Sequence, residues 1–167
     1  MSERASAPGG LALIEALVNT VRDIATGADT LGSAEVREHF GITAAEVDEA
    51  RALRESLRAA CLAHAGHPPH RTVTPLGELL AKAPLRVVVD DRDGSAALVP
   101  VDAALLLSRV AAAIAEAVGD GTWSRLKACE AADCGWAFYD RSPAGRGRWC
   151  SMAVCGARAK MRRYRAK

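Results

Sequence analysis

The chain has 167 residues, of which half are hydrophobic, and its 22 Lys and Arg against 20 Asp and Glu give a formal net charge of +2. It contains no run of about 18 apolar residues and no apolar segment behind a basic start, so we expect neither a membrane span nor a secretory signal. We therefore expect a soluble, cytoplasmic protein.

The charge is distributed unevenly along the chain. Residues 1–140 carry 13 basic and 20 acidic side chains, whereas residues 141–167 carry 9 basic side chains and no acidic one. Six of the seven Phe, Tyr and Trp residues also follow residue 122. A basic end on an otherwise acidic chain indicates a surface that faces nucleic acid.

Apolar residues at helical spacing predict the helices of the N-terminal part. A first helix is expected from about residue 10 to 26, including Ala25, and Gly27 would end it. Ser33 can cap a short helix that closes at Gly41. Thr43 and Glu46 form a capping box that opens a long helix to about His64. One face of this long helix should be buried, with the residues Val47, Ala50, Leu53, Leu57 and Cys61.

The pattern then changes to that of strands. Thr74-Pro75 starts a short helix with proline at its first position. The β-like runs over 85–90 and 97–101 flank Asp91-Arg92-Asp93-Gly94, which predicts a β-hairpin. Asp102 should cap a helix to about Val118. Its inward face is expected to hold Leu105, Leu106, Val110, Ile114 and Val118. Gly119-Asp120-Gly121 is the expected boundary between a helical domain (1–119) and a small module (122–167).

Four cysteines in that module are spaced C-x4-C, fifteen residues, C-x4-C. Two close pairs separated by a hairpin-sized gap predict one structural Zn²⁺ held by four thiolates, namely Cys129, Cys134, Cys150 and Cys155. Two disulfides are the alternative, and reduced thiols in the cytosol favour the metal. Four thiolates leave no open position for water, so a catalytic zinc is not expected.

The other candidate ligands have simpler interpretations. Cys61 fits a small buried hydrophobic residue. His64, His67 and His70 are spaced by three residues, but Pro68 and Pro69 would break a shared helical face, so an exposed loop is favoured. No catalytic constellation is recognisable, and we do not expect an enzyme.

The module should fold as a knuckle, a hairpin and a helix, the order of a treble-clef-like zinc finger, so that the whole chain is mainly α with a small β-hairpin. A strand is expected over residues 136–139, a turn over 142–145 and a return strand at Arg148-Trp149. The aromatic residues of this hairpin would cover the metal, the alternative being a stacking platform for bases. Ser151 can cap a last helix. Its apolar face should pack on the finger, with the residues Val154, Ala157, Met161 and Tyr164.

The last 45 residues resemble the CGNR zinc finger family. The family signature is matched by Trp149-Cys150-Ser151-Met152, by Cys155-Gly156-Ala157-Arg158 and by Lys160. The preceding part is similar to the ABATE domain that usually accompanies this finger, through Leu17-Val18-Asn19-Thr20 and Asp29-Thr30-Leu31. The resemblance implies zinc on the four cysteines and a role in DNA binding and transcription regulation. Ala157 stands where the family has Asn, so any contact made by that Asn is missing here.

The basic residues are the candidate contacts to nucleic acid, because arginine suits bidentate recognition of phosphate. They are Arg141, Arg146, Arg148, Arg158, Lys160, Arg162, Arg163 and Arg165. The helical domain would then bind a small effector or mediate a homodimer. No residue pattern supports the effector. The alternative is a zinc-stabilised protein-interaction module whose basic helix docks on an acidic surface.

Overall fold

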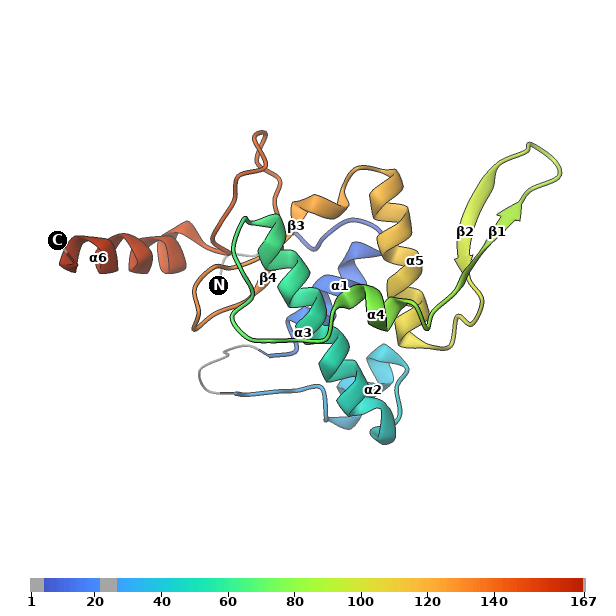
Figure 1. Cartoon of the computed structure of the whole chain (residues 1–167), viewed down its shortest axis with the longest axis horizontal. Coiled ribbons are helices and arrows are strands. Elements are labelled where there is room, and N and C mark those ends of the chain that lie inside the picture. The colour runs from blue at the N-terminus through green and yellow to red at the C-terminus, as the bar shows by residue number, and fades with distance from the viewer. Residues whose placement is uncertain (1–4, 22–26, 167) are drawn as a thin grey trace.

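The structure is a computed structural model that describes residues 5–21 and 27–166. Helices form the middle of the molecule, and a β-hairpin and the last helix project from its two ends (Figure 1). The predicted fold class, mainly α with a small β-hairpin and a C-terminal finger, is confirmed. The helices of the middle part are α1 (Leu11–Val18), α2 (Ala34–Phe40), α3 (Val47–His64), α4 (Leu76–Leu80) and α5 (Leu106–Gly119).

One hydrophobic core holds α1, α3 and α5 together. Ile14 and Leu17 of α1, Leu57 of α3 and Val110 of α5 are fully buried. The predicted buried face of α3 is confirmed along its whole length. The same core includes Leu126 and other residues beyond the expected domain boundary. That boundary stays a prediction, because the side chains on its two sides pack together.

Local capping explains where the middle helices begin. Ser33 Oγ accepts a hydrogen bond from Val36 N, and Gly41 ends α2 with a φ of 61° that favours glycine. Thr43 and Glu46 form the expected capping box before α3, around a short 3-10 turn. These predicted ends are confirmed.

Two helix predictions are wrong in their extent. The first helix ends at Val18 instead of continuing to residue 26, since Thr20 Oγ1 donates back to Leu17 O and Val21 forms a β-bridge with Asp29. The expected helical position Ala25 lies outside the described residues. Asp102 accepts from Ala104 N in a turn of its own, and α5 begins only at Leu106.

The inward face predicted for α5 is confirmed for Leu106 and Val110, and Ile114 packs against the core. Leu106, Val110, Ala113 and Ala117 point into the core, whereas Leu105 and Val118 are exposed, in contrast to the expectation. Pro75 precedes α4 as its cap residue.

The predicted hairpin is present as β1 (Leu85–Val89) and β2 (Ala96–Pro100), which pair antiparallel. A second hairpin joins β3 (Leu126–Ala128) to β4 (Ala137–Tyr139). The expected return strand at Arg148-Trp149 is wrong, because β4 pairs with the segment before Cys129. Within the described residues, no helix is long and apolar enough to cross a membrane.

Candidate metal centre

The four predicted cysteines come together. Their Sγ atoms all lie within 4.8 Å of one another, with Cys134 and Cys150 3.6 Å apart and Cys150 and Cys155 3.7 Å apart. A tetrahedral zinc ion with Zn–S bonds of about 2.3 Å separates its sulfurs by about 3.8 Å. The cluster therefore fits a single tetrahedral ion. None of these four cysteines forms a disulfide.

The first pair lies in the turn between β3 and β4. Cys129 N donates to Trp136 O (2.9 Å) and Cys134 N donates to Ala131 O (2.9 Å), which folds the chain into a knuckle. Gly135 follows with a φ of 56°, a backbone conformation that suits glycine. The knuckle is thus fixed by the hairpin on which it sits.

The second pair lies where an irregular segment meets the last helix, α6 (Ala157–Arg165). Ser151 Oγ accepts from Val154 N, and a π-helical turn over Met152–Gly156 brings Cys155 to the cluster. A Cβ on Gly156 would lie 3.0 Å from Met152 Sδ and 3.3 Å from Trp149 Cδ1. The glycine after Cys155 therefore lets this turn pack closely.

The clustered thiols carry unequal proton affinities. Hydrogen bonds from the Cys134 and Cys150 thiols, together with the backbone N–H groups of Cys150 and Ala131, lower the pKa of Cys129. Donating to Cys129 raises the pKa of Cys134. Several thiolates this close repel one another, so a cation is needed before all four can ionise. The arrangement is that of a metal-binding site.

The segment between the two pairs is held by buried carboxylates. Asp140 accepts hydrogen bonds from Ser142 N (3.0 Å), Gly147 N (2.6 Å) and Lys127 Nζ (3.0 Å). Although burial raises the pKa of Asp140, these hydrogen bonds outweigh it and lower the pKa. Glu130, also buried, receives both nitrogens of the Arg148 fork at 2.6 and 2.7 Å. These contacts replace the predicted return strand.

Two side chains of the helical part form hydrogen bonds with the backbone of the finger. Asn19, at the end of α1, donates to Ala137 O (3.0 Å) and accepts from Ala137 N (2.7 Å), as a neighbouring strand would. Arg58 of α3 is buried and donates to Gly135 O (3.2 Å) and to Val18 O (2.7 Å). Sequence reasoning missed both roles. Arg58 is next to Leu57 of the apolar face of α3, and no pattern in the sequence marks its side chain as buried.

Arg58 ends a chain of alternating charges that is largely buried. Asp29 pairs with Arg54 (2.8 Å), Arg54 with Glu55 (2.9 Å) and Glu55 with Arg58 (2.5 Å). Burial raises the pKa of Asp29, but the Arg54 guanidinium and Leu31 N–H hold it below its usual range. This chain connects the loop after α1 to the knuckle of the finger.

The eight predicted basic contacts fall into two groups. Three already have partners in the protein: Arg141 donates to Ala5 O and Ser6 O, Arg148 pairs with Glu130, and Arg158 pairs with Asp133 at 3.0 Å. The others are exposed and show no hydrogen bond or ion pair to the part of the chain that the structure describes. They are Arg146, Lys160, Arg162, Arg163 and Arg165.

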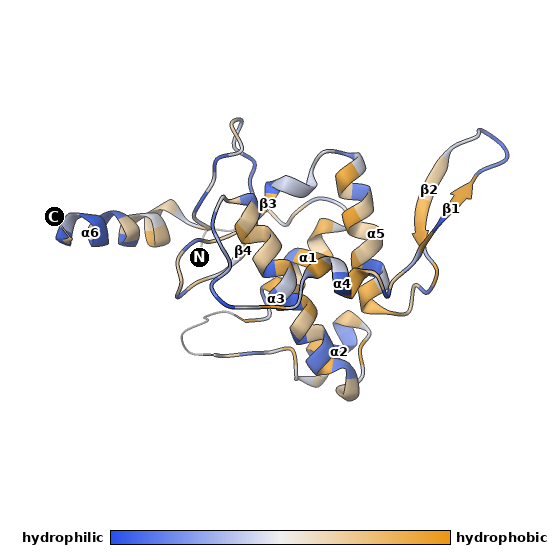
Figure 2. Ribbon diagram, viewed as in Figure 1, coloured by the Kyte–Doolittle hydropathy of each residue, from blue (hydrophilic) through white to orange (hydrophobic). Residues whose placement is uncertain are grey.

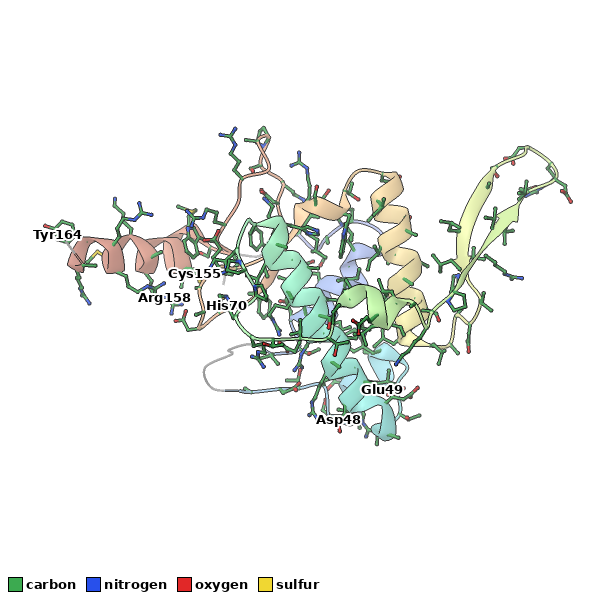
Figure 3. The ribbon with its side chains drawn as sticks, viewed as in Figure 1. Asp48, Glu49, His70, Cys155, Arg158 and Tyr164 are labelled. Atoms are coloured by element: carbon green, nitrogen blue, oxygen red, sulfur yellow. The ribbon has the colours of Figure 1, made fainter. Side chains whose placement is uncertain are left out.

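The prediction that the apolar face of α6 packs on the finger is wrong. Val154, Met161 and Tyr164 are 50%, 52% and 77% exposed, and α6 projects away from the rest of the molecule (Figure 1). Cys155 and Arg158 lie at the root of this helix and Tyr164 near its far end (Figure 3). The cysteine cluster thus holds only the first turn of an otherwise uncovered helix.

Comparison with protein families decides what the chain is. Residues 11–121 match the ABATE family, described as "putative stress-induced transcription regulator", and residues 125–167 match the CGNR zinc finger. The chain belongs to the ABATE family. A comparison with curated proteins found no match.

The residues that carry the family resemblance in the ABATE part fix the segment after α1, and one of them contacts the finger. Asn19 binds β4, Thr30 Oγ1 donates to Thr20 O (2.9 Å), and Asp29 holds Arg54. In the CGNR tetrad, the Arg158 guanidinium lies 4.0 Å from Cys155 Sγ and links it to Asp133 of the first knuckle. Ala157 is exposed in the first turn of α6. The missing Asn therefore leaves no buried gap.

The aromatic residues of the finger, His64 and Cys61 pack within the protein. Phe138 is buried, Trp149 packs on the cysteine cluster, and Tyr139 packs on the main core. The His64 Nδ1 lies 2.7 Å from Leu126 O, and its ring contacts Trp123 edge to face, so it belongs to the ABATE–finger junction. Cys61 is fully buried, which raises the pKa of its thiol to about 12. Phe138 and Cys61 are thus buried as predicted, whereas Tyr139 packs on the main core instead of the metal site, and His64 is half-buried at the end of α3 instead of lying in an exposed loop.

Proposed function

We propose that this ABATE protein is a zinc-dependent DNA-binding regulator. Its four cysteines hold one structural Zn²⁺, which fixes the root of α6, and the free cations of α6 contact DNA phosphates. The observation that carries the proposal is a projecting helix with four exposed, unpartnered cations among the described residues. A Zn–thiolate centre needs reduced cysteines, which agrees with a cytoplasmic protein.

Charge supports a polyanionic partner. A zinc ion with four thiolates carries a net charge of −2, and the nine basic residues after position 140 exceed what is needed to neutralise it. Arg148 and Arg158 already offset Glu130 and Asp133. The cations farther along α6 have no such partner and are free for an external anion. Phosphate contacts of this kind fix position on DNA and carry no sequence information.

The test is fluorescence anisotropy of a labelled random-sequence duplex with the zinc-loaded full chain, titrated with salt. The double variant Arg162→Gln/Arg163→Gln removes two cations from α6. Since each phosphate contact contributes about 0.9 to the slope of log affinity against log salt, the slope should fall by about 2.

Arg86→Gln/Arg92→Gln is the matched control, because these exposed arginines lie on the β1–β2 hairpin at the other end of the molecule. It removes the same charge and should leave the slope nearly unchanged. Equal effects of the two variants would show attraction by net charge alone. Absence of binding at low salt would refute the proposal.

The exposed apolar residues of α6 favour a second candidate, a protein-interaction module. Met161 and Tyr164 would bury apolar area against a protein, whereas phosphates require only the cations. Met161→Gln separates the two candidates. It should leave DNA affinity unchanged if α6 binds phosphates, and it should weaken capture of an acidic protein partner if α6 is an interaction helix.

A further inference from the structure

The β1–β2 hairpin has one face that consists only of apolar side chains. Cross-strand partners share a face, and successive residues alternate between faces. The register Leu85↔Pro100, Val87↔Leu98 and Val89↔Ala96 therefore places these six residues on one side of the hairpin. Val87, Val89 and Leu98 are 64%, 55% and 51% exposed. We call this side the apolar face.

The opposite side of the hairpin is mixed. It carries Arg86, Val88, Ala97 and Val99, of which Arg86 is charged and exposed. The charged residues Asp90 and Arg92 pair with each other at the turn. Figure 2 shows apolar strands with a hydrophilic tip at the end of the molecule away from α6. The hairpin thus has a single side that water solvates poorly.

This hairpin has too few strands to be stable by itself. An isolated two-stranded hairpin is marginal in water, and stability needs more strands or a packed hydrophobic face. Here the hairpin leaves the helices near Pro84 and Val101, whose backbones pair at its base, and projects beyond them (Figure 1). The helical core reaches only the base of this face, where Leu85 and Pro100 are half-buried, and leaves Val87, Val89 and Leu98 uncovered, so a contact from outside the chain would complete it.

We propose that the apolar face is a homodimer interface, in which it packs against the same face of a second copy of this chain. An uncharged apolar surface is complemented by another uncharged apolar surface, and a second copy presents one of the same size and shape. Two-fold pairing of identical patches is the commonest symmetry of oligomers. Two such hairpins can stack as sheets about 10 Å apart, and their projection from the helices leaves the approach open.

The other uncovered apolar residues make a poorer complement. Met161 and Tyr164 of α6, and Val154 in the turn before it, lie among arginines, which would lose hydration against an uncharged face without gaining a partner. Residues of the apolar face meet no such cost against their own copies. The interface is small beside the roughly 1,200 Å² at the lower limit of standard interfaces, so we expect a dimer that dissociates at micromolar concentrations.

Analytical ultracentrifugation of the zinc-loaded full chain tests this inference, from about 1 to about 200 µM. Val87→Lys places a charge in the centre of the apolar face and should weaken dimerisation at least about 10-fold, because the charge would be buried in the dimer. Val88→Lys makes the same substitution one residue away, on the mixed face, and should leave dimerisation nearly unchanged. Both positions are exposed, and circular dichroism verifies that each variant is folded.

Salt provides an independent readout. An apolar interface should keep or increase its affinity at high salt, whereas an assembly through the arginines of α6 should dissociate. A wild-type chain that stays monomeric at about 200 µM would overturn the inference, as would equal effects of Val87→Lys and Val88→Lys or a dimer that high salt dissolves. The inference does not rest on DNA binding, and the Arg162→Gln/Arg163→Gln variant should dimerise like the wild type.

Discussion

The C-terminal basic segment has two parts that the fold treats differently. Up to Cys150, Arg148 pairs with the buried Glu130 and Arg141 donates to Ala5 O and Ser6 O, whereas Arg146 is exposed. After Arg158, which pairs with Asp133, the cations of α6 are exposed and have no partner in the described chain. The first part holds the finger in place, and the second part is available to other molecules.

This difference follows from the position of acidic residues. Glu130 and Asp133 lie in the first knuckle and pair with Arg148 and Arg158, while the part of α6 after Arg158 extends beyond their reach. Arginine therefore stabilises the fold in one part, and in the other part it is the candidate for recognition of a partner. If this division holds, changes in the first part should alter stability and changes in the second part should alter binding.

Metal removal should have the largest effect. Binding of structural zinc contributes on the order of 10 kcal/mol, and without it the four thiols cannot all ionise at their present distances. We expect chelation to release α6 and abolish DNA binding, while α1, α3 and α5 stay helical, because their shared core includes no cysteine ligand.

Circular dichroism and anisotropy with and without chelator measure the two responses. Cys129→Ser, which removes one ligand, should reproduce the chelated state without any chelator present. Loss of the whole helical signal would contradict this expectation, because it would mean that the folding of α1, α3 and α5 depends on the metal.

Arg58→Met should have the next largest effect on stability. Removing one member of a buried ionic network leaves Glu55 with less compensation and deprives Val18 O and Gly135 O of a donor, which costs about 3–5 kcal/mol. Urea denaturation of the zinc-loaded protein measures the change. Arg162→Met is the matched control on α6 and should change stability by less than about 0.5 kcal/mol. Similar losses in both variants would contradict the separation of cohesion from recognition.

The residues that sequence reasoning placed correctly share a strong local constraint. The capping box at Thr43 and Glu46 and the αL glycine at Gly41 act within one or two turns of chain. The four cysteines have the spacings typical of the ligands of one metal ion, and their Sγ atoms do come together. Such features were predictable because a few neighbouring residues determine them.

The failures involve partners that lie far along the chain. β3 is three residues long, too short to show alternation, so β4 was paired with Arg148-Trp149 instead of with Leu126–Ala128. The apolar face of α6 has the correct period, but periodicity does not show whether a surface exists to cover it. Arg58 is buried because backbone carbonyls of α1 and the knuckle converge on it, which nothing in its own helix reveals.

Asp140→Asn should give the smallest effect, and one that depends on pH. Asn keeps one acceptor oxygen but not the charge that pairs with buried Lys127, so we expect a loss of about 1–3 kcal/mol at pH 7. The folded protein lowers the pKa of Asp140, so the unfolded chain takes up the proton first as the pH falls. The stability contributed by the carboxylate is therefore fully present above the unfolded pKa of about 4 and declines as the pH drops towards the folded pKa.

The measurement is the difference in unfolding free energy between wild type and Asp140→Asn from pH 7 down to about pH 3. Acid also protonates the cysteine ligands, but this affects both proteins alike and cancels in the difference. A difference that narrows below about pH 4 identifies the charge of Asp140 as the source of the stability. A difference independent of pH would assign the stability to the geometry of the hydrogen bonds from Ser142 and Gly147. The charge of the carboxylate would then contribute little to the stability of the finger.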